Sequence, residues 1–413
     1  MKFDTIIIGG GLSGLTAGIE SARAGRRTAI VTAGQSALHF WSGSFEFLCE
    51  QDSREVIERP LERAARLDPS HPYRRIGIER TERLLGRVQP MLAEAGITVN
   101  GSLGRNHYRL TPMGFAKPAW LTLDDYLAFD HPNEISGRQV CVVNIYSYLD
   151  FYPRYLETGL RKLGAAAMSR EVNIPQLDVL RKSTTEMRAT NISRFLRDDA
   201  VDALASEINR VSAGTDMVIM PAILGMFSDE PVKRLRRGVE RPIYFVATTP
   251  ASVPGVRCQL SLKALFNRLG GTYLAGDTVL KGDFEGTRLR RVYTENFGSI
   301  PLEADNFMIG SGSFFGHGLV ATFDRIFEPV FGLDLNAGKS RTDWYDKDFY
   351  APQPYMAYGV VTDDRFRPSR GGRTVENLYA AGALLSGFNA LREGSGAGIT
   401  LATALAAAEE LTR

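Results

Sequence analysis

Apolar residues in the first part of the chain alternate between short continuous runs and helical spacing. Residues 2–8 end in the run Ile6-Ile7-Ile8, a glycine-rich turn follows at 9–14, and residues 15–22 carry apolar side chains at helical spacing. A second apolar run, 28–32, comes after Gly25. Strand, glycine turn, helix and strand in this order are typical of a βαβ unit with two parallel strands.

The same order of elements returns near the C-terminus. Residues 305–309 form an apolar strand pattern that ends in the small-residue turn 310–313, and a strand at 376–381 ends at Gly382. Residues 394–398 are again glycine-rich and lead into an Ala- and Leu-rich helix. Because this helix is apolar nearly all round, we expect it to be buried.

Between the two ends the chain carries a second α/β pattern. Strand patterns at 139–145, 166–174, 216–220 and 242–247 alternate with helical spacing at 151–163, 184–210 and 231–237. This alternation predicts a parallel or mixed sheet covered by helices. No glycine turn follows residue 145, so we expect a cap or interface domain and not a second nucleotide site. Helical spacing also occurs at 53–67 and 79–95, whereas 100–133 shows no clear period.

The turn at 9–14 fits the G-x-G-x-x-G fingerprint of dinucleotide binding. Gly9 allows the tight turn, Gly11 lets the backbone approach a phosphate, and Gly14 lets the helix pack closely on the sheet. The helix start offers free N–H groups and a positive dipole end to an anion. One feature is missing, because Thr32 stands where an acid usually binds the adenosine ribose. A tight turn without a ligand is the alternative.

A loop rich in small and hydroxyl side chains follows at 33–44. Such a loop can wrap a planar cofactor, and an ordinary surface connection is the alternative. The residues predicted to bind a cofactor are Gly9, Gly10, Gly11, Leu12, Ser13, Gly14, Thr32, Ala33, Gly34, Ser36, Ser42, Gly43, Ser44, Gly312, Gly382, Ala383, Gly396, Ala397 and Gly398. No catalytic base stands out. His39, His317 and Arg392 are the nearest polar candidates by position, and a structural role is the alternative for each.

Composition excludes several functional classes. The chain of 413 residues has 49 Lys and Arg against 47 Asp and Glu, a balance that argues against a nucleic-acid-binding surface. The sequence has neither an apolar stretch of membrane-spanning length nor an N-terminal signal region, so we expect a protein that is located in the cytoplasm. Cys49, Cys141 and Cys258 form no C-x-x-C pair, and no metal site is predicted. Any iron–sulfur cluster must come from another chain.

Several longer stretches resemble a known family. They are residues 3–5 with 9–14, 35–40 with 42–44, 177–181, 310–315, 349–354 and 359–363. In these stretches the chain is similar to the B subunit of bacterial anaerobic glycerol-3-phosphate dehydrogenase, and the resemblance covers essentially the whole sequence. We therefore expect an α/β fold: a Rossmann-like, two-dinucleotide-turn flavoprotein domain (1–133 and 251–413) with an inserted second α/β cap or interface domain (134–250).

The resemblance implies a flavin-containing subunit that works with two others, an FAD-containing, substrate-oxidising catalytic subunit and an iron–sulfur subunit. The iron–sulfur subunit would hold the pair at the inner face of the cell membrane and pass electrons to quinone. The overall reaction would convert sn-glycerol 3-phosphate and quinone into dihydroxyacetone phosphate and quinol. The implied cofactor is FMN, with FAD as the alternative. FMN has no adenosine, so its binding does not need an acid at the position of Thr32. Ala383 also stands where FAD-binding members commonly carry an acid.

Two other functions stay open. The first is a self-sufficient FAD-dependent dehydrogenase of the fumarate reductase type, which needs a set of substrate-binding Arg and His residues that the sequence does not show. The second is a cofactor-free scaffold subunit of the same complex. We expect the isolated chain to be inactive with glycerol 3-phosphate.

Overall fold

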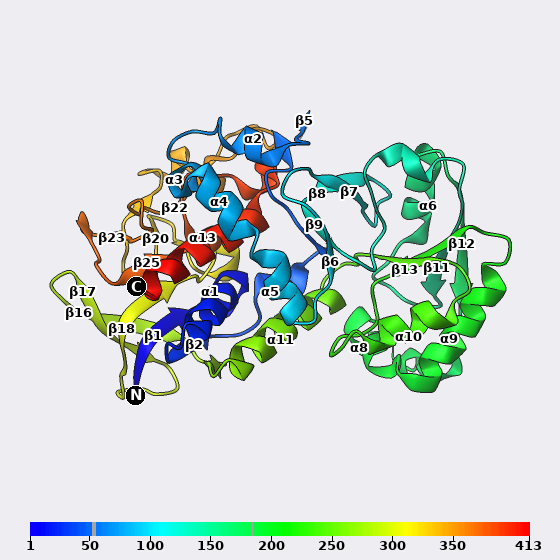
Figure 1. The fold of residues 1–413 in the computed structure, drawn as a ribbon, viewed down its shortest axis with the longest axis horizontal. Coiled ribbons are helices and arrows are strands. Elements are labelled where there is room, and N and C mark those ends of the chain that lie inside the picture. Colours follow the sequence, from blue (N-terminus) through cyan, green and yellow to red (C-terminus); the bar gives the residue numbers. More distant parts are fainter. Residues whose placement is uncertain (52–54, 184) are drawn as a thin grey trace. The chain divides into compact units, whose positions relative to one another are not determined.

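A computed structural model gives the fold of residues 1–51, 55–183 and 185–413 (Figure 1). These residues form two compact units. Unit 1 comprises residues 1–37, 46–96 and 261–413, and unit 2 comprises 38–45 and 97–260. The predicted insertion, 134–250, lies within unit 2, which also takes in 38–45 and 97–133 because short strands of these two segments pair with each other.

Unit 1 is built on a mixed sheet with the strand order β15-β2-β1-β18-β17-β16, and β25 also pairs with β18. The apolar run Ile6–Ile8 is buried in β1, between the neighbouring strands β2 and β18. β15, β2, β1, β18 and β25 run parallel, whereas β16 and β17 form an antiparallel hairpin beside β18. The strands are β1 (Lys2–Ile8), β2 (Thr28–Thr32), β15 (Thr272–Ala275), β16 (Val279–Glu285), β17 (Arg288–Thr294), β18 (Leu302–Ile309) and β25 (Leu378–Ala380).

Helices α1 and α13 pack against each other in unit 1, although they come from opposite ends of the chain. α13 is buried along most of its length, as its apolar composition predicts. The helices of unit 1 are α1 (Leu12–Arg23), α2 (Pro60–Ala64), α3 (Pro72–Ile76), α4 (Ile78–Leu85), α5 (Val88–Glu94), α12 (Ala390–Glu393) and α13 (Gly396–Leu411). Its two-residue strands are β4 (Glu50–Gln51), β5 (Glu55–Val56), β19 (Val320–Ala321), β20 (Ile326–Phe327), β21 (Leu335–Asn336), β22 (Gly359–Val360), β23 (Ser369–Arg370) and β24 (Arg373–Thr374).

Three predicted helices differ from the observed ones. The stretch 79–95 is two helices, α4 and α5, because Gly86 caps the first. In 53–67 only α2 is helical, and Pro60 begins it, at a position where the missing N–H is not needed. The stretch 184–210 is also two helices, α8 (Ala189–Phe195) and α9 (Asp198–Val211). Residues 53, 54 and 184 of these stretches lie outside the described residues.

Unit 2 contains a parallel sheet with the strand order β12-β11-β13-β14, which agrees with the strands predicted between 139 and 247. Residues 100–133, which show no period in the sequence, contribute short antiparallel strands. The strands of unit 2 are β3 (Ser44–Phe45), β6 (Val99–Gly101), β7 (His107–Leu110), β8 (Ala116–Ala119), β9 (Leu121–Leu123), β10 (Ala128–Phe129), β11 (Gln139–Ile145), β12 (Ala166–Val172), β13 (Met217–Pro221) and β14 (Ile243–Val246). Its helices include α6 (Pro153–Lys162), α7 (Asp178–Arg181), α8, α9 and α10 (Glu230–Gly238), and α11 (Val253–Arg268) runs from unit 2 into unit 1.

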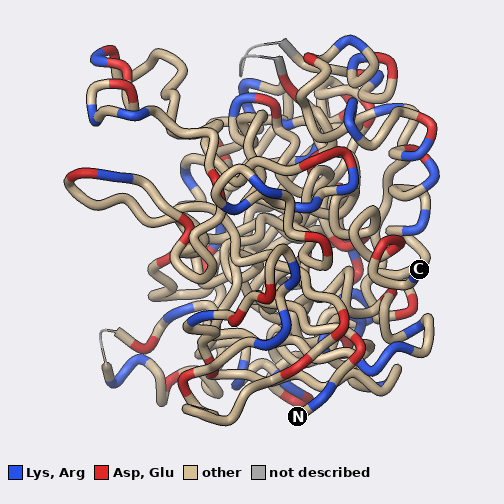
Figure 2. The backbone as a smooth tube through the Cα atoms, turned by 90° about the vertical axis from the view of Figure 1, so that its left-hand side faces the viewer, with Lys and Arg blue, Asp and Glu red and all other residues tan. Residues whose placement is uncertain are grey.

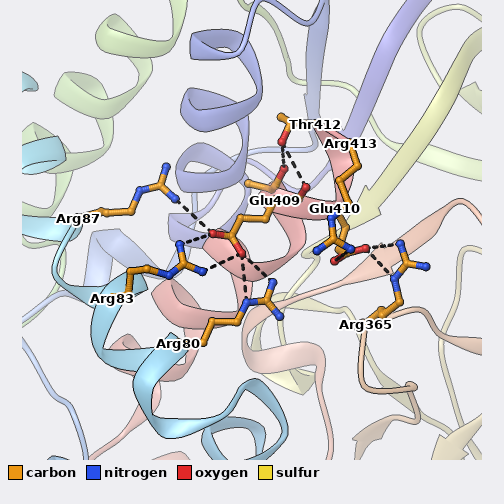
Figure 3. A network of polar contacts seen from close by, with 9 residues as sticks. Arg80, Arg83, Arg87, Arg365, Glu409, Glu410, Thr412 and Arg413 are labelled. Atoms are coloured by element: carbon orange, nitrogen blue, oxygen red, sulfur yellow. Dashed lines mark hydrogen bonds and ion pairs between the residues drawn. The ribbon is translucent and has the colours of Figure 1, made fainter.

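An ion-pair network holds the last turn of α13 in unit 1 (Figure 3). Glu409 accepts hydrogen bonds from Arg80 Nη2 at 2.8 Å and from Arg83 Nη1 at 2.7 Å. The neighbouring Glu410 pairs with Arg365 and Arg413. α13 is thereby tied to α4 and to the segment that carries Arg365.

Charged residues of both signs are interspersed along the backbone (Figure 2). Cys49, Cys141 and Cys258 are all buried. Among the described residues, no helix has the length and hydropathy needed to cross a bilayer. Likewise, the described part of the chain contains no group of three or more His, Cys, Asp or Glu side chains that could hold a metal ion.

Candidate cofactor site

The carboxyl ends of β1, β2, β18 and β25 lie at one edge of the unit 1 sheet. The register pairs Ile8 with both Val31 and Ile309, and Ile309 with Ala380. The turns that follow these strands therefore begin side by side. All four turns contain residues that the sequence predicts to bind a cofactor.

Three glycines of the first turn are required by the protein's own packing. A Cβ on Gly9, which has φ +112°, would stand 2.4 Å from the carbonyl oxygen of Gly310. A Cβ on Gly14 would stand 1.8 Å from the carbonyl oxygen of Gly9. A Cβ on Gly10 would meet the Tyr273 hydroxyl at 2.4 Å. Any side chain at these positions would collide with backbone or with a packed ring.

Gly11 is different. Its φ of −82° suits any residue, and the nearest atom to a Cβ built there is the Ser36 Cβ, at an ordinary contact distance of 3.5 Å. The position is half-buried. Internal packing therefore does not explain why residue 11 is glycine, whereas the close approach of a ligand's phosphate would.

The start of α1 supplies donors for such a phosphate. The first backbone N–H of the helix to find an acceptor is that of Leu15, which donates to the Gly11 carbonyl at 2.9 Å. The N–H groups of Leu12, Ser13 and Gly14 belong to the first turn, where a helix offers no acceptor. Together with the positive end of the helix dipole, they fit a phosphate group.

Gly382 links the two ends of the chain at this edge. A Cβ built on it would lie 3.2 Å from the Ser13 Cβ and 3.6 Å from the Thr400 Cγ2. Its N–H donates to the Thr403 hydroxyl at 3.0 Å. The start of α1 and the first turns of α13 therefore both adjoin Gly382. Ser13 also lies against Gly310, where a built Cβ would be 2.6 Å from the Ser13 hydroxyl.

The start of α13 carries three of the residues predicted to bind a cofactor, Gly396, Ala397 and Gly398. The Gly398 N–H already donates to the Glu46 carbonyl at 2.8 Å and so is not available to a ligand. A Cβ on Gly398 would also collide with the Tyr73 hydroxyl at 2.4 Å, so packing alone requires this glycine. Gly396 and Ala397 remain in the first turn, where no intrahelical acceptor is available.

A histidine that the sequence did not single out supports this helix start. His71 is buried, and its Nδ1 accepts the Tyr73 N–H at 3.2 Å, so the neutral ring carries its proton on Nε2. Nε2 then donates to the Glu393 carboxylate at 3.2 Å, which also accepts from the Ser395 hydroxyl at 2.8 Å. Burial raises the pKa of the Tyr73 phenol well above its usual value. Because the paired residues lie far apart in the sequence, no spacing pattern could have indicated them.

The remaining predicted residues of unit 1 lie along the same strand ends. Thr32 is buried at the end of β2, and its hydroxyl donates to the Gly34 carbonyl at 3.3 Å. Ala33, Gly34 and Ala383 are exposed. Gly312, in the turn after β18, has φ +87°, a backbone conformation that favours glycine.

The predicted residues Ser42, Gly43 and Ser44 belong to unit 2. Arg109 donates to the Ser44 hydroxyl at 2.6 Å and to the Ser42 hydroxyl at 2.9 Å. Gly43 has φ +84°, and a Cβ there would stand 2.4 Å from the Tyr126 ring. Contacts within unit 2 are therefore enough to explain why serine, glycine and serine stand at these three positions. Their role toward a cofactor stays a prediction.

The three catalytic candidates have the following surroundings. His39, in unit 2, is half-buried; burial lowers the pKa of its imidazole, and a hydrogen bond with Gln259 opposes that effect. His317, in unit 1, is exposed and has φ +61°. Arg392 lies in α12, where its N–H donates to the Asn389 side chain at 3.2 Å. A catalytic role for any of them stays a prediction.

Glycine turns at the ends of parallel strands and helix starts gathered beside them define a dinucleotide-binding fold. The family described as "FAD binding domain" matches residues 4–399, so the chain belongs to this class of flavoprotein folds. A 3-ketosteroid Δ1-dehydrogenase from Sterolibacterium denitrificans is similar over 100% of this chain and 99% of its own, with 10% identity and a TM-score of 0.46. That likeness is too distant to add to the argument.

Sequence relatives define the family more closely. The B subunit of anaerobic glycerol-3-phosphate dehydrogenase from Yersinia enterocolitica is 40% identical over 100% of this chain and 98% of its own length. The protein of the same name from Pectobacterium carotovorum is 40% identical over 100% of this chain and 99% of its own. The chain belongs to the family of anaerobic glycerol-3-phosphate dehydrogenase B subunits. The fold class and the family predicted from the sequence are thereby confirmed.

Proposed function

We propose that unit 1 holds one flavin at the edge where β1, β2, β18 and β25 end. We further propose that the chain is the flavin-containing electron-transfer subunit of a quinone-linked anaerobic glycerol-3-phosphate dehydrogenase. The observation that carries the cofactor proposal is Gly11, since it is the glycine of the first turn for which the protein's own packing gives no reason. The half-exposed helix start beside it would accept a phosphate.

The chain's own residues would bind and orient the group. The N–H groups of Leu12, Ser13 and Gly14 would hold its phosphate, and those of Gly396 and Ala397 would donate to its ring system. The buried helix α13 would keep water from the inner side of the site. A flavin, when bound, supplies the acceptance and release of electrons. No base of this chain is assigned to substrate chemistry.

The identity of the flavin is a separate part of the proposal. The family points to FAD, and it does not support FMN as the first choice. The observation in favour of FMN is the end of β2, where Thr32 offers a hydroxyl and no carboxylate to an adenosine ribose. We take FAD as the working cofactor.

The relatives' name suggests a complex, and the partners and the reaction proposed for it are those that the family resemblance in the sequence implies. The relatives are named as one subunit of several. In our proposal the partners are a catalytic subunit that contains FAD and an iron–sulfur subunit that anchors the complex at the inner face of the cell membrane. The complex would oxidise sn-glycerol 3-phosphate to dihydroxyacetone phosphate and reduce quinone. The isolated chain would not turn over glycerol 3-phosphate.

Absorbance and mass spectrometry of the purified chain test the proposal. We expect flavin bands in the visible spectrum, and the mass of the heat-released cofactor separates FAD from FMN. A folded chain that shows no flavin bands, even after incubation with FAD and FMN, would support the cofactor-free scaffold instead. Glycerol 3-phosphate oxidation by the isolated chain would contradict the subunit role.

A further inference from the structure

Unit 2 contains a cavity of about 450 Å³ at the carboxyl end of β13. Its walls come from three segments, which are the end of α8 with the start of α9 (193–198), the loop after β13 (225–228) and the first turn of α10 (230–234). All three segments belong to unit 2. A cavity of this volume is typical of a site for a small molecule.

The order of the strands in unit 2 places this cavity where α/β proteins bind ligands. The sheet has the order β12-β11-β13-β14, so the chain passes from β11 to β12 on one side and from β12 to β13 on the other. The direction of the connections therefore changes between β11 and β13. In open parallel sheets, ligands bind outside the carboxyl ends of the strands at such a point. The cavity adjoins the carboxyl end of one of these two strands.

Hydrogen bonds within unit 2 fix the walls of the cavity. The hydroxyl of the buried Ser193 accepts the Met226 N–H at 3.1 Å and so joins α8 to the loop after β13. In the same loop, the Gly225 carbonyl accepts Arg257 Nη1 at 2.9 Å. Walls that are already held in place lower the entropy lost when a ligand binds.

Most charged side chains around the cavity are already paired. Arg234 donates to both carboxylate oxygens of Asp202, at 2.8 and 2.6 Å, and its Nη1 lies 3.6 Å from the Asp198 carboxylate. Glu230 accepts a hydrogen bond from Arg237 at 2.7 Å. The charges of these side chains are therefore compensated without a ligand.

Arg197 differs from the other charged residues of the cavity. It forms no ion pair with any residue that the structure describes, and its guanidinium lies over the Phe227 ring, 5.6 Å from the centroid. Both side chains are exposed, Phe227 by 59%. A guanidinium held on a ring offers a planar cationic surface and can donate two parallel hydrogen bonds to a carboxylate or a phosphate.

We propose that this cavity binds a small anion with a planar, apolar body, that is, an aromatic carboxylate or an aryl phosphate. Arg197 pairs with the anionic group, and Met226 and Phe227 contact the apolar body. No glycine turn follows β11, so the ligand is not expected to be a dinucleotide. The inference concerns unit 2 alone and does not depend on the flavin proposed for unit 1.

Titration calorimetry of the purified full-length chain tests the site, with benzoate and phenyl phosphate as probes. We expect one saturable site for at least one probe, and the tighter of the two identifies the anionic group. Arg197→Gln should weaken binding of that probe about tenfold or more, and Phe227→Ser roughly fivefold. Arg194→Gln is the matched control, because it removes the same charge from an exposed position that does not line the cavity. It should bind as the wild type does.

Several results would overturn the inference. The absence of saturable binding for both probes would do so, as would an affinity of Arg197→Gln within twofold of the wild type. Equal losses in Arg197→Gln and Arg194→Gln would assign binding to the general charge of the surface. Inorganic phosphate that binds as tightly as phenyl phosphate would exclude recognition of a planar body. Melting temperatures of the variants separate a lost site from a lost fold, and a probe bound at the flavin site of unit 1 would not respond to Arg197→Gln.

Discussion

The carbonyl oxygen of Gly9 lies 1.8 Å from the point that a Cβ on Gly14 would occupy. Glycine is thus required at position 14, because only glycine lets the helix pack this closely against the turn. Gly11, in the same fingerprint, leaves room for a side chain toward Ser36. One motif therefore contains a glycine needed for folding and a glycine that packing leaves unexplained. The two can be separated by mutation.

Gly11→Ala should leave the fold intact and reduce flavin binding. Alanine is compatible with φ −82° and can stabilise the chain by about 0.4–1 kcal/mol, because it reduces the entropy of the unfolded state. A methyl group against the phosphate should weaken binding by about tenfold or more, that is about 1.4 kcal/mol. The ratio of visible to ultraviolet absorbance and the melting temperature measure the two effects.

Gly14→Ala is the control for this prediction. Its Cβ would collide with backbone, so we expect a large fall in the melting temperature. Full flavin content in a folded Gly11→Ala protein would argue against a phosphate at this turn.

Glu409→Gln should weaken the attachment of α13. Burial favours the neutral acid, but hydrogen bonds from Arg83 and Arg80 outweigh it and lower the pKa of Glu409 below its usual value. Because the folded state holds the charged form, this stabilisation is present above the unfolded pKa and is lost as the pH falls through the lowered pKa. We expect a loss of about 1 kcal/mol at neutral pH, which vanishes in acid.

Urea denaturation at several pH values checks this prediction. Glu62→Gln is the matched control, since Glu62 pairs with Arg59 where both side chains are exposed. That variant should change stability by less than about 0.5 kcal/mol. Equal effects of the two substitutions would show that the network around Glu409 adds nothing beyond a surface pair.

Asp125 should make unit 2 less stable as the pH rises. Burial raises the pKa of Asp125 to about 6, against the opposing effect of Arg257, whose Nη2 lies 3.7 Å from the carboxylate. The folded state then binds more protons than the unfolded state between the usual pKa and about 6, so stability falls through this range. Asp125→Asn has no such titration. Relative to this variant, the wild type should lose about 2 kcal/mol between pH 4 and pH 7.

Thermal or urea unfolding of the two proteins at matched pH values measures the difference. Asparagine keeps the shape of the side chain, and Arg257 retains its hydrogen bonds to the carbonyls of Leu224 and Gly225. A stability difference that stays constant with pH would contradict the raised pKa.

Asn377→Ala should destabilise unit 1. The buried Asn377 side chain donates to the carbonyls of Leu289 and Asp305, both at 2.8 Å, and accepts the Leu289 N–H at 2.9 Å. Alanine would leave the N–H and the carbonyl of the buried Leu289 without this partner, at about 1–3 kcal/mol. Asn296→Ala removes an exposed hydrogen bond to Gly276 and should cost less than about 0.5 kcal/mol. Denaturant midpoints compare the two variants.

Local patterns in the sequence predict the elements that frame the site. The order of β1, the turn at 9–14, α1 and β2 follows from hydrophobic spacing and glycine placement, and the burial of α13 follows from its composition. Long-range contacts are not encoded in such patterns. The pairing of β3 with β9 and the bond between His71 and Glu393 join residues far apart in the chain.

The strand β1 sits inside its sheet, between β2 and β18. During synthesis, β1 leaves the ribosome long before its second neighbour, residues 302–309, which is made only after all of unit 2. The middle of the polypeptide can therefore fold while β1 still has an open edge. The proposed flavin-binding unit is complete only when the part of the chain that follows unit 2 has been made. The cofactor would therefore be loaded late in translation.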